Sequence, residues 1–370
     1  MVDKIYQDLR SKINTYALGF PATASGVEIE LLKRLFTRDE AEVGVNLGMM
    51  PEPLEAIAAR MKRDPDELLA VLSSMIRKGT VFNSLSAEGE TCFHAAPFMH
   101  GFAENSAGNM DPELANLFER FQEEGYLDHF GKLPTDAFLR FTPVNEAVSS
   151  DLTVAAYNQI EPLLRSKKTI AAIPCYCRDK GKALGDKIDL PTSNVCFVFD
   201  WLADYSVERG QAKYLTIDEA LEIQQGCEDA GLVNMPSNLK SPHVMCHCDG
   251  KYCTIFRAIK RLPKPVDAVT SDFYTEVKKD DCISCDACID ICPMEAITGN
   301  GEGTVDINLD RCIGCGVCIP TCAVGALNLQ EKPEELKKRK PISPREFVAE
   351  ISKSRGFETT PIILDSHQTV

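Results

Sequence analysis

The chain has 370 residues, of which 44% are hydrophobic, with 16 cysteines and a formal net charge of −15. This length and apolar content suffice for two or three domains with buried cores. The acidic balance argues against binding to nucleic acid, and it suits a redox partner with a basic docking face. The N-terminal sequence shows no export signal, and no apolar stretch of about 18 residues occurs, so we expect a cytoplasmic protein without membrane insertion.

The first 100 residues predict a small helical domain that ends in a hairpin. Residues 3–14 have a helical pattern, and residues 16–25 are expected to form an extended linker. The elements predicted next are helices at 29–36, 37–47, 54–61 and 65–78 and strands at 80–85 and 91–97. Thr37 and Glu40 form a capping box at one helix start, and Gly79 ends the last helix.

Helices followed by a hairpin resemble a winged helix, which makes DNA binding one functional hypothesis. The helix at 65–78 would be the recognition helix, but it carries acidic residues as well as Arg77 and Lys78, so its face is not a basic stripe. We therefore favour a packing or partner-docking module over a DNA-binding one. Cys92, alone in the hairpin, is expected to be a small core residue.

Residues 101–265 predict a mixed α/β module. The elements predicted here are helices at 111–130, 151–164 and 216–230 and a buried strand at 168–173. Thr216 and Glu219 form a capping box at the start of the last of these helices. Cys227 lies on the apolar face of this helix, so we expect it to be a core residue.

Six further cysteines of this module fall in short clusters at the ends of apolar segments: Cys175, Cys177, Cys196, Cys246, Cys248 and Cys253. C-x-C pairs from distant parts of a chain can hold an iron-sulfur cluster or a zinc ion, because both need several converging thiolates. Spacing alone does not choose between a third 4Fe-4S cluster, zinc, and reactive or structural thiols. Arg178 and Lys251 are candidates for stabilising thiolates, while His243 and His247 are expected in turns or at the surface.

Eight cysteines lie in residues 282–322 as two copies of C-x-x-C-x-x-C-x-x-x-C. Three closely spaced thiolates bind three irons of a cubane, and in two-cluster ferredoxins the fourth ligand comes from the other motif. One cluster is therefore assigned to Cys282, Cys285, Cys288 and Cys322, and the other to Cys312, Cys315, Cys318 and Cys292. A pair of zinc sites is the alternative, which two complete four-cysteine motifs disfavour.

The residues around these motifs also repeat. Apolar pairs follow each motif at 296–297 and 326–327, and residues 304–307 predict a strand after a glycine-rich turn. This stretch resembles bacterial two-cluster 4Fe-4S ferredoxins over residues 272–330. The resemblance implies a (β-α-β)2 fold that carries two 4Fe-4S clusters, although Asp286 stands where the second half has Gly316.

Residues 28–330 as a whole resemble a poorly characterised group of 4Fe-4S dicluster proteins of anaerobic bacteria and archaea. The resemblance rests on Cys175-Tyr176-Cys177-Arg178, Cys196-Phe197-Val198-Phe199 and Ala230-Gly231-Leu232-Val233. It departs from the group's pattern because residues 181–190 contain no cysteine and the closing run contains only three. After the ferredoxin-like stretch, residues 343–352 predict one short amphipathic helix in a C-terminal tail.

We therefore expect an α+β protein with four parts: a winged-helix-like domain (1–100), a mixed α/β module with a third metal site (101–265), a two-cluster ferredoxin domain (272–330) and a tail (331–370). The leading functional hypothesis is electron transfer, as a subunit or partner of a larger anaerobic redox enzyme. One alternative is an oxidoreductase with its own thiol or metal active site at residues 175–253. Another is a redox-sensing winged-helix regulator. The sequence has no G-x-G-x-x-G motif for a nucleotide cofactor, which favours an electron-transfer component of an oxidoreductase over a stand-alone enzyme. Whether the chain is an enzyme by itself stays open.

Overall fold

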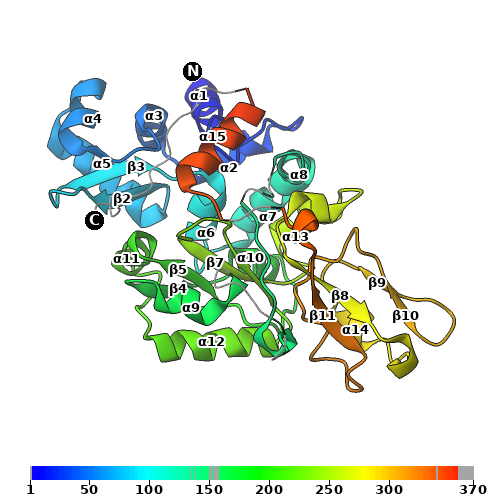
Figure 1. The fold of residues 1–370 in the computed structure, drawn as a ribbon. Helices are drawn as coiled ribbons and strands as arrows, with labels where there is room; N and C mark the ends of the chain where they lie inside the picture. Colours follow the sequence, from blue (N-terminus) through cyan, green and yellow to red (C-terminus); the bar gives the residue numbers. More distant parts are fainter. Residues whose placement is uncertain are drawn as a thin grey trace.

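A computed structural model describes residues 2–356, apart from residues 135, 137, 150–151, 153–157 and 339–340. Figure 1 shows N-terminal helices, a central sheet with helices packed on it, and a C-terminal region of short strands to one side. No helix among the described residues is long and apolar enough to cross a membrane.

Helices dominate the N-terminal region, whose elements are α1 (Val2–Asn14), α2 (Val27–Leu35), α3 (Arg38–Asn46), β1 (Glu52–Pro53), α4 (Leu54–Met61), α5 (Pro65–Lys78), β2 (Val81–Leu85) and β3 (Thr91–Ala95). The predicted helices and hairpin are confirmed within a few residues, whereas the sequence pattern does not predict β1. β3 lies between β1 and β2 in an antiparallel sheet. This order of elements is compatible with a winged helix, and that assignment stays a prediction.

Local capping explains where these helices begin and end. The Thr37 hydroxyl accepts a hydrogen bond from the Glu40 amide at 3.2 Å, and the Glu40 carboxylate accepts one from the Thr37 amide at 2.8 Å. The Asp64 carboxylate likewise accepts hydrogen bonds from the first amides of α5. Gly79 ends α5 with a φ of 79°, a left-handed conformation that glycine adopts without steric cost.

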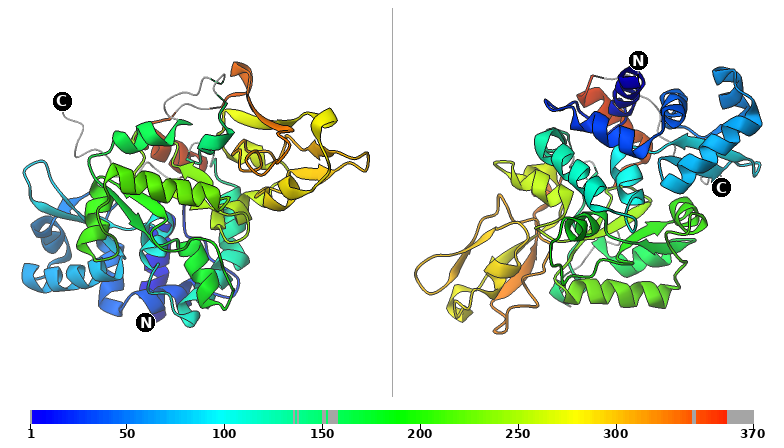
Figure 2. Two further views of the ribbon diagram at one scale, coloured as in Figure 1. Left: turned by 90° about the horizontal axis from the view of Figure 1, so that it is seen from below. Right: turned by 180° about the vertical axis from the view of Figure 1, so that it is seen from behind.

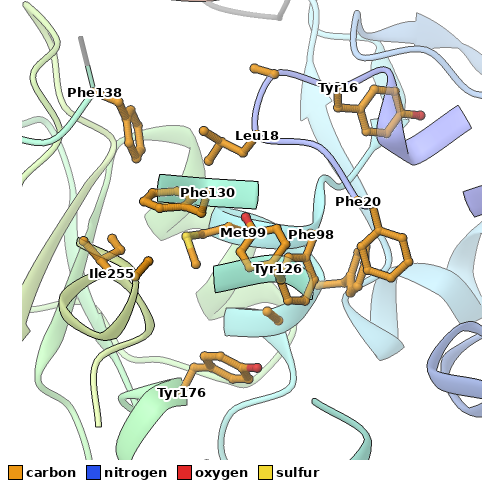
Figure 3. Close-up of a cluster of buried hydrophobic side chains, with 14 of the residues drawn as sticks. Tyr16, Leu18, Phe20, Phe98, Met99, Tyr126, Phe130, Phe138, Tyr176 and Ile255 are labelled. Carbon is orange, nitrogen blue, oxygen red and sulfur yellow. The ribbon is translucent and has the colours of Figure 1, made fainter. Parts of the chain in front are cut away.

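The segment predicted as a linker, residues 16–25, has no helix or strand but is part of the core. Tyr16, Leu18 and Phe20 are buried, and the Phe20 ring lies 4.4 Å from the Phe121 ring. Figure 3 shows these side chains beside the aromatic residues of the following segments. The apolar side chains therefore fix this segment against the rest of the protein, although the backbone makes no regular element.

The middle region contains η1 (Phe98–Phe102), α6 (Ala103–Asn105), α7 (Pro112–Phe121), η2 (Gln122–Tyr126), α8 (Leu127–Gly131), η4 (Asn145–Ala147), α9 (Ile160–Arg165), β4 (Ile170–Ile173), α10 (Tyr176–Ala183), β5 (Cys196–Phe199), α11 (Trp201–Glu208), α12 (Ile217–Asp229), β6 (Val233–Pro236), β7 (Val244–Cys248), α13 (Thr254–Lys260) and η6 (Pro265–Ala268). The predicted strand and the helices at 111–130 and 216–230 are confirmed, although η2 interrupts the first helix. Most of the helix predicted at 151–164 falls outside the described residues, and its last residues lie in α9. The sequence pattern does not predict α10, α11, α13 or β6.

The four strands of this region form an antiparallel sheet with the order β4-β5-β7-β6. Ala171 and Ile173 pack with residues of α11, whereas Ile170 and Ala172 pack on the other face with residues of α9. Figure 2 shows α12 lying across the face that is turned away from the N-terminal helices. Both faces are covered, which explains why these strands are continuous apolar runs in the sequence.

The C-terminal region contains β8 (Phe273–Val277), η7 (Lys279–Asp281), α14 (Ala287–Ile291), β9 (Ile297–Gly299), β10 (Val305–Ile307), β11 (Leu327–Glu331), η8 (Glu334–Leu336) and α15 (Pro344–Ser354). β8 pairs with β11 and β9 with β10, both antiparallel. The short amphipathic helix predicted in the tail is confirmed as α15, and it packs back on the N-terminal helices (Figure 1). Arg355 at its end donates hydrogen bonds to the carbonyl oxygens of Asn14 and Ala17. Residues 357–370 lie outside the described part of the chain.

Candidate metal centres

The two cysteine motifs of the C-terminal region have the same backbone conformation. Left-handed residues occur in both halves at matching places, 30 positions apart: Ser284 and Gly314, Asp286 and Gly316, and Glu295 and Gly325. Asp286 has a φ of 61° and Gly316 a φ of 75°. Aspartate tolerates this conformation better than most residues, so the difference between the two motifs leaves the cluster loop unchanged.

The eight cysteines of these motifs surround two separate cavities. One cavity is lined by Cys282, Cys285, Cys288 and Cys322, and the other by Cys292, Cys312, Cys315 and Cys318. The last cysteine of each motif thus lies with the first three of the other motif. This grouping matches the ligand sets expected from the sequence, and the ligand roles themselves are part of the proposal below.

Backbone amides point at the sulfurs in both cavities. The amide of Ala296 donates to the Cys292 sulfur at 3.3 Å, and the amide of Ala326 donates to the Cys322 sulfur at 3.2 Å. The pKa of the Cys282 thiol is lowered by a hydrogen bond from the Ser284 amide. Such donors stabilise thiolate sulfur, so the loops suit metal-bound cysteines.

The two cavities differ in exposure. Cys285 in the first cavity is exposed to solvent, whereas Cys312, Cys315 and Cys318 in the second are buried. The Cys315 carbonyl oxygen accepts a hydrogen bond from the Val144 amide at 3.0 Å, which ties the second loop to the middle region. Burial raises the pKa of Cys318 to about 12. The loop that carries Cys285 is therefore more exposed than the loop that carries Cys315.

All six cysteines predicted in the middle region line one further cavity, hereafter the six-cysteine site: Cys175, Cys177, Cys196, Cys246, Cys248 and Cys253. Cys246 and Cys248 lie two residues apart on β7 and therefore face the same side of the sheet. Cys196 begins β5, next to β7 in the sheet. Cys175 precedes α10, and Cys253 precedes α13. The fold thus brings together residues from four elements.

The thiols of the six-cysteine site interact in a closed ring, in the order 175, 177, 253, 248, 246 and 196. The sulfurs of Cys253 and Cys248 lie 3.4 Å apart, and the amide of Thr254 donates to the Cys177 sulfur at 3.4 Å. Hydrogen bonds from Cys196 and Cys248 lower the pKa of Cys246 to about 5. The pKa of Cys177 is also lowered by its thiol neighbours, whereas those of the other four thiols are raised. Cys177 and Cys246 are therefore the thiols that this arrangement holds as thiolates, the form that binds metal.

Arg178 also lines the six-cysteine site and is completely buried. One of its terminal nitrogens donates to the carbonyl oxygen of His247 at 3.0 Å and to the Asp249 carboxylate at 3.2 Å. Its Nε and other terminal nitrogen are buried without a hydrogen-bond partner. A buried cation with free donors beside six thiols suits an anionic metal-sulfur group. Lys251, the other candidate, is exposed and lies over the Tyr252 ring instead.

The expectation that His247 lies in a turn or at the surface is wrong. His247 is completely buried on β7, and its Nε2 lies 2.6 Å from the Gln224 side-chain oxygen. The alternation of a strand turns it to the face opposite its two neighbouring cysteines. Burial lowers its pKa to about 4. His243 lies in a bend directly before β7, in agreement with the expectation of a turn, and is half-buried beside Trp201. Cys92 and Cys227 are buried in the core as predicted.

A group of ionised side chains holds α10 and α13 together behind the six-cysteine site. Glu119 on α7 forms ion pairs with Lys180 of α10 and, at 2.6 Å, with Arg257 of α13. Burial opposes ionisation of Glu119, but these two cations lower its pKa to about 2. The sequence gives no sign that Glu119 lies near the six-cysteine site, because no cysteine is close to it in the chain. Its role depends on helix packing.

The six-cysteine site adjoins the second cavity of the C-terminal region. Gly250, between Cys248 and Cys253, contacts Pro293, which follows Cys292 in sequence. A Cβ atom at Gly250 would lie 2.5 Å from the Pro293 carbonyl oxygen, so only glycine permits this approach. The two sites are therefore linked by direct contact of their loops.

Among the described residues, no group of three or more His, Cys, Asp or Glu side chains is arranged to hold a single metal ion. This includes the eight cysteines of the C-terminal motifs, whose sulfurs surround cavities rather than one point.

Comparison with known proteins covers one part of the chain. No curated protein matches the sequence, and no solved structure matches it. Residues 281–326 match a protein family described as the 4Fe-4S dicluster domain. This segment contains the eight cysteines of the two cavities. Together, the match and the two cavities show that the C-terminal region is a 4Fe-4S dicluster domain that carries two 4Fe-4S clusters.

Proposed function

We propose that the protein transfers electrons through three 4Fe-4S clusters, two in the dicluster domain and a third in the six-cysteine site. The ligand sets in the dicluster domain are the two crossed groups of cysteines described above, and four of the six middle cysteines hold the third cluster. The observation that carries this proposal is the contact of Gly250 with Pro293, which joins the two cysteine-bearing loops. This contact places the six-cysteine site next to the cavity of the dicluster domain that Cys292 lines.

The third cluster is favoured over zinc by two features of the six-cysteine site. The thiols form a ring around a cavity rather than a tetrahedron about one point, as a zinc ion would require. The unpartnered nitrogens of Arg178 are donors that cluster sulfides accept, and their charge offsets part of the negative charge of an iron-sulfur cluster. Free thiols alone would leave these buried donors without partners, which is costly.

Bound clusters supply one-electron transfer, and the surrounding residues set their accessibility and charge. In the first cavity, Cys285 and the neighbouring Ile283 are exposed, with Ile283 at 61% of its full exposure. Asp280, Asp281 and Asp286 are exposed around them. An exposed apolar side chain with an acidic rim suits a redox protein with a basic docking face. We therefore place partner docking, and membership in a larger redox enzyme, at this surface.

The sequence also suggested an oxidoreductase and a winged-helix regulator, and the structure favours the first of these over the second. An oxidoreductase with its own site at residues 175–253 is favoured by an apolar cavity beside the six-cysteine site, described in the next subsection. For a redox-sensing regulator, α5 would contact DNA, yet its first turn exposes Asp66 and Glu67. This acidic turn disfavours DNA contact. The cytoplasmic location and the anaerobic host stay predictions.

Metal analysis of protein purified without oxygen tests the proposal. Three clusters require about twelve irons and twelve acid-labile sulfides per chain. Electron paramagnetic resonance of the reduced protein should then show three interacting paramagnets. About eight irons with one zinc would contradict the third cluster and make the six-cysteine site structural. About eight irons without zinc would leave thiol chemistry as the role of the middle cysteines.

A further inference from the structure

A cavity separate from the three cysteine-lined ones, hereafter the apolar cavity, lies where the N-terminal region, the middle region and α15 meet. Its volume is about 130 Å³. Residues far apart in sequence line it, among them Ala17, Phe82, Phe138, Trp201 and Phe347. Junctions between regions of a fold are common places for small-molecule sites. The cavity belongs to none of the cysteine sites described above.

The polar groups of the apolar cavity lack hydrogen-bond partners. These groups are the Nδ1 of His94, both ring nitrogens of His243 and the hydroxyl of Ser237. His94 is 2% exposed and Ser237 5% exposed. Buried polar groups normally have partners, and a bound molecule would satisfy these. They therefore indicate a ligand that forms hydrogen bonds.

The chemistry of the lining limits the class of ligand. None of the described residues that line the cavity is Asp, Glu, Lys or Arg. Burial lowers the pKa of His94 to about 3 and that of His243 to about 4, so both rings are neutral near pH 7. Neutral imidazole and hydroxyl groups can both donate and accept hydrogen bonds. They suit an uncharged ligand with hydroxyl or carbonyl groups.

The size and the shape of the apolar cavity indicate a ligand with one planar ring. An apolar protein cavity of about 150 Å³ is known to bind benzene, so the volume here suits one ring. The Trp201 ring lies 5.6 Å from the His94 ring and 5.7 Å from the His243 ring. Elsewhere in the lining, Phe138 stacks on Phe347 with centroids 5.0 Å apart. A planar ring in the cavity would have aromatic neighbours both in the rings around Trp201 and in the Phe138–Phe347 pair.

The apolar cavity is next to the six-cysteine site. Met99 and His100 line both cavities. In Figure 3, Leu18 and Phe138 of the apolar cavity lie on one side of Met99, and Tyr176 of the six-cysteine site lies on the other. His100 has a φ of 55°, a left-handed conformation that is rare for a residue with a Cβ atom. Among the described residues, Met99 and His100 are the two that line both cavities.

We propose that the apolar cavity binds an uncharged molecule with one planar six-membered ring and hydroxyl or carbonyl groups, of the phenol and quinone class. Ser237 and His243 would form hydrogen bonds with its oxygen atoms, and Trp201 and Phe138 would contact its ring. Beside Met99 and His100, a bound quinone would accept two electrons, one at a time, from the third cluster and two protons from water, and would leave as the hydroquinone; this step rests on the proposed function of the six-cysteine site. Binding itself does not depend on it.

Isothermal titration calorimetry of the full-length, cluster-loaded protein without oxygen tests the proposal. The probes are phenol and hydroquinone, with benzoate as a charged molecule of similar size. Phenol and hydroquinone should bind saturably at one site per chain, and benzoate should not. Absence of saturable binding by both probes would overturn the proposal, and equal binding of benzoate would overturn the assignment to uncharged ligands.

Variants locate the binding. Ala17→Leu adds a larger side chain to the lining and should abolish binding. Ser237→Ala removes one hydrogen bond and should weaken hydroquinone binding roughly threefold to tenfold. Ser84→Ala is the matched control, because the Ser84 hydroxyl is also buried and unpartnered but does not line the cavity; it should leave binding unchanged. Unchanged binding in both Ala17→Leu and Ser237→Ala would overturn the proposal.

Iron analysis of the same samples separates this inference from the proposed function. Saturable binding in protein with eight irons would support the apolar cavity and contradict the third cluster. Twelve irons without binding of phenol or hydroquinone would contradict the cavity assignment alone. Circular dichroism of Ala17→Leu shows whether it is folded, and Ser237→Ala decides the question if it is not.

Discussion

The dicluster domain and the six-cysteine site gather thiols in different ways. In the dicluster domain, three cysteines of each cavity lie on one short loop, and their spacing is visible in the sequence. In the six-cysteine site, the thiols come from β5, β7 and the segments that precede α10 and α13. The first arrangement depends on local backbone conformation, and the second depends on the packing of the whole middle region. A substitution that disturbs tertiary packing should therefore affect the six-cysteine site more than the dicluster domain.

The largest effect is expected for Arg178→Met. Removal of the guanidinium would leave the buried Asp249 carboxylate and the thiolates without their cation, at a cost of about 3–5 kcal/mol of folding stability. The third cluster should be lost while the dicluster domain keeps its eight irons. Iron analysis and denaturant unfolding measure both effects. Arg165→Met is the control, because Arg165 is an exposed arginine on α9. Twelve irons in Arg178→Met would contradict the role of this cation.

Gly250→Ala tests the contact between the two sites. Its new Cβ atom would overlap the Pro293 carbonyl group, and backbone shifts of this kind cost about 1–3 kcal/mol. We expect a lower thermal midpoint and a weaker magnetic interaction between the third cluster and its neighbour. Gly226→Ala is the matched control, because a Cβ atom at Gly226 would meet nothing within 4 Å. An unchanged interaction in Gly250→Ala would show that this contact does not couple the sites.

Glu119→Gln should weaken the six-cysteine site by about 1–2 kcal/mol, because Glu119 joins α10 to α13 through ion pairs. The pKa of Glu119 is about 2 in the folded protein, below the ordinary value of about 4.3. Its contribution to stability is therefore present above about pH 5 and is lost as the pH falls towards 2. In mild acid the third cluster should be released before the other two in the wild type. In Glu119→Gln this pH dependence should be smaller, and an identical acid profile for both proteins would exclude Glu119 as the cause.

The smallest effect is expected for Asp286→Gly. Glycine adopts the left-handed conformation of residue 286 without strain, so iron content should not change. Loss of a carboxylate beside the first cluster should raise its reduction potential by at most about 40 mV, since a unit charge a few Å away in water is worth about 1 kcal/mol. A redox titration followed by electron paramagnetic resonance measures the shift. A lower potential would contradict this electrostatic argument.

Local signals in the sequence predicted much of this fold. The capping boxes at Thr37 and Thr216 marked helix starts that the structure confirms. The repeat of cysteines at 282–322 predicted the two clusters, because each loop carries three of the four cysteines of its cavity and the other motif supplies the fourth. Asp286 and Ala323, which stands where a second proline is common, are the departures visible in the sequence, and Asp286 keeps the same left-handed backbone as Gly316.

The convergence of the six middle cysteines was not predictable in the same way. It depends on the strand order β4-β5-β7-β6 and on the short helices α10 and α13, for which the sequence gives weak signals. His247 was assigned to a turn or the surface because its place on a strand was not foreseen. The apolar cavity brings together residues as distant as Ala17 and Phe347, and no motif marks such a site.

The most direct test of the three-cluster account is the iron content of cysteine variants purified without oxygen. The triple variant Cys246→Ser, Cys248→Ser, Cys253→Ser leaves only three thiols in the six-cysteine site, so it should retain about eight irons per chain and lose the third paramagnet. Cys92→Ser, at a buried cysteine outside the sites, should retain about twelve. Cys315→Ser should lose the cluster of the second cavity and keep the other two. If the triple variant and the wild type contain the same amount of iron, the six-cysteine site holds no cluster and the account is wrong.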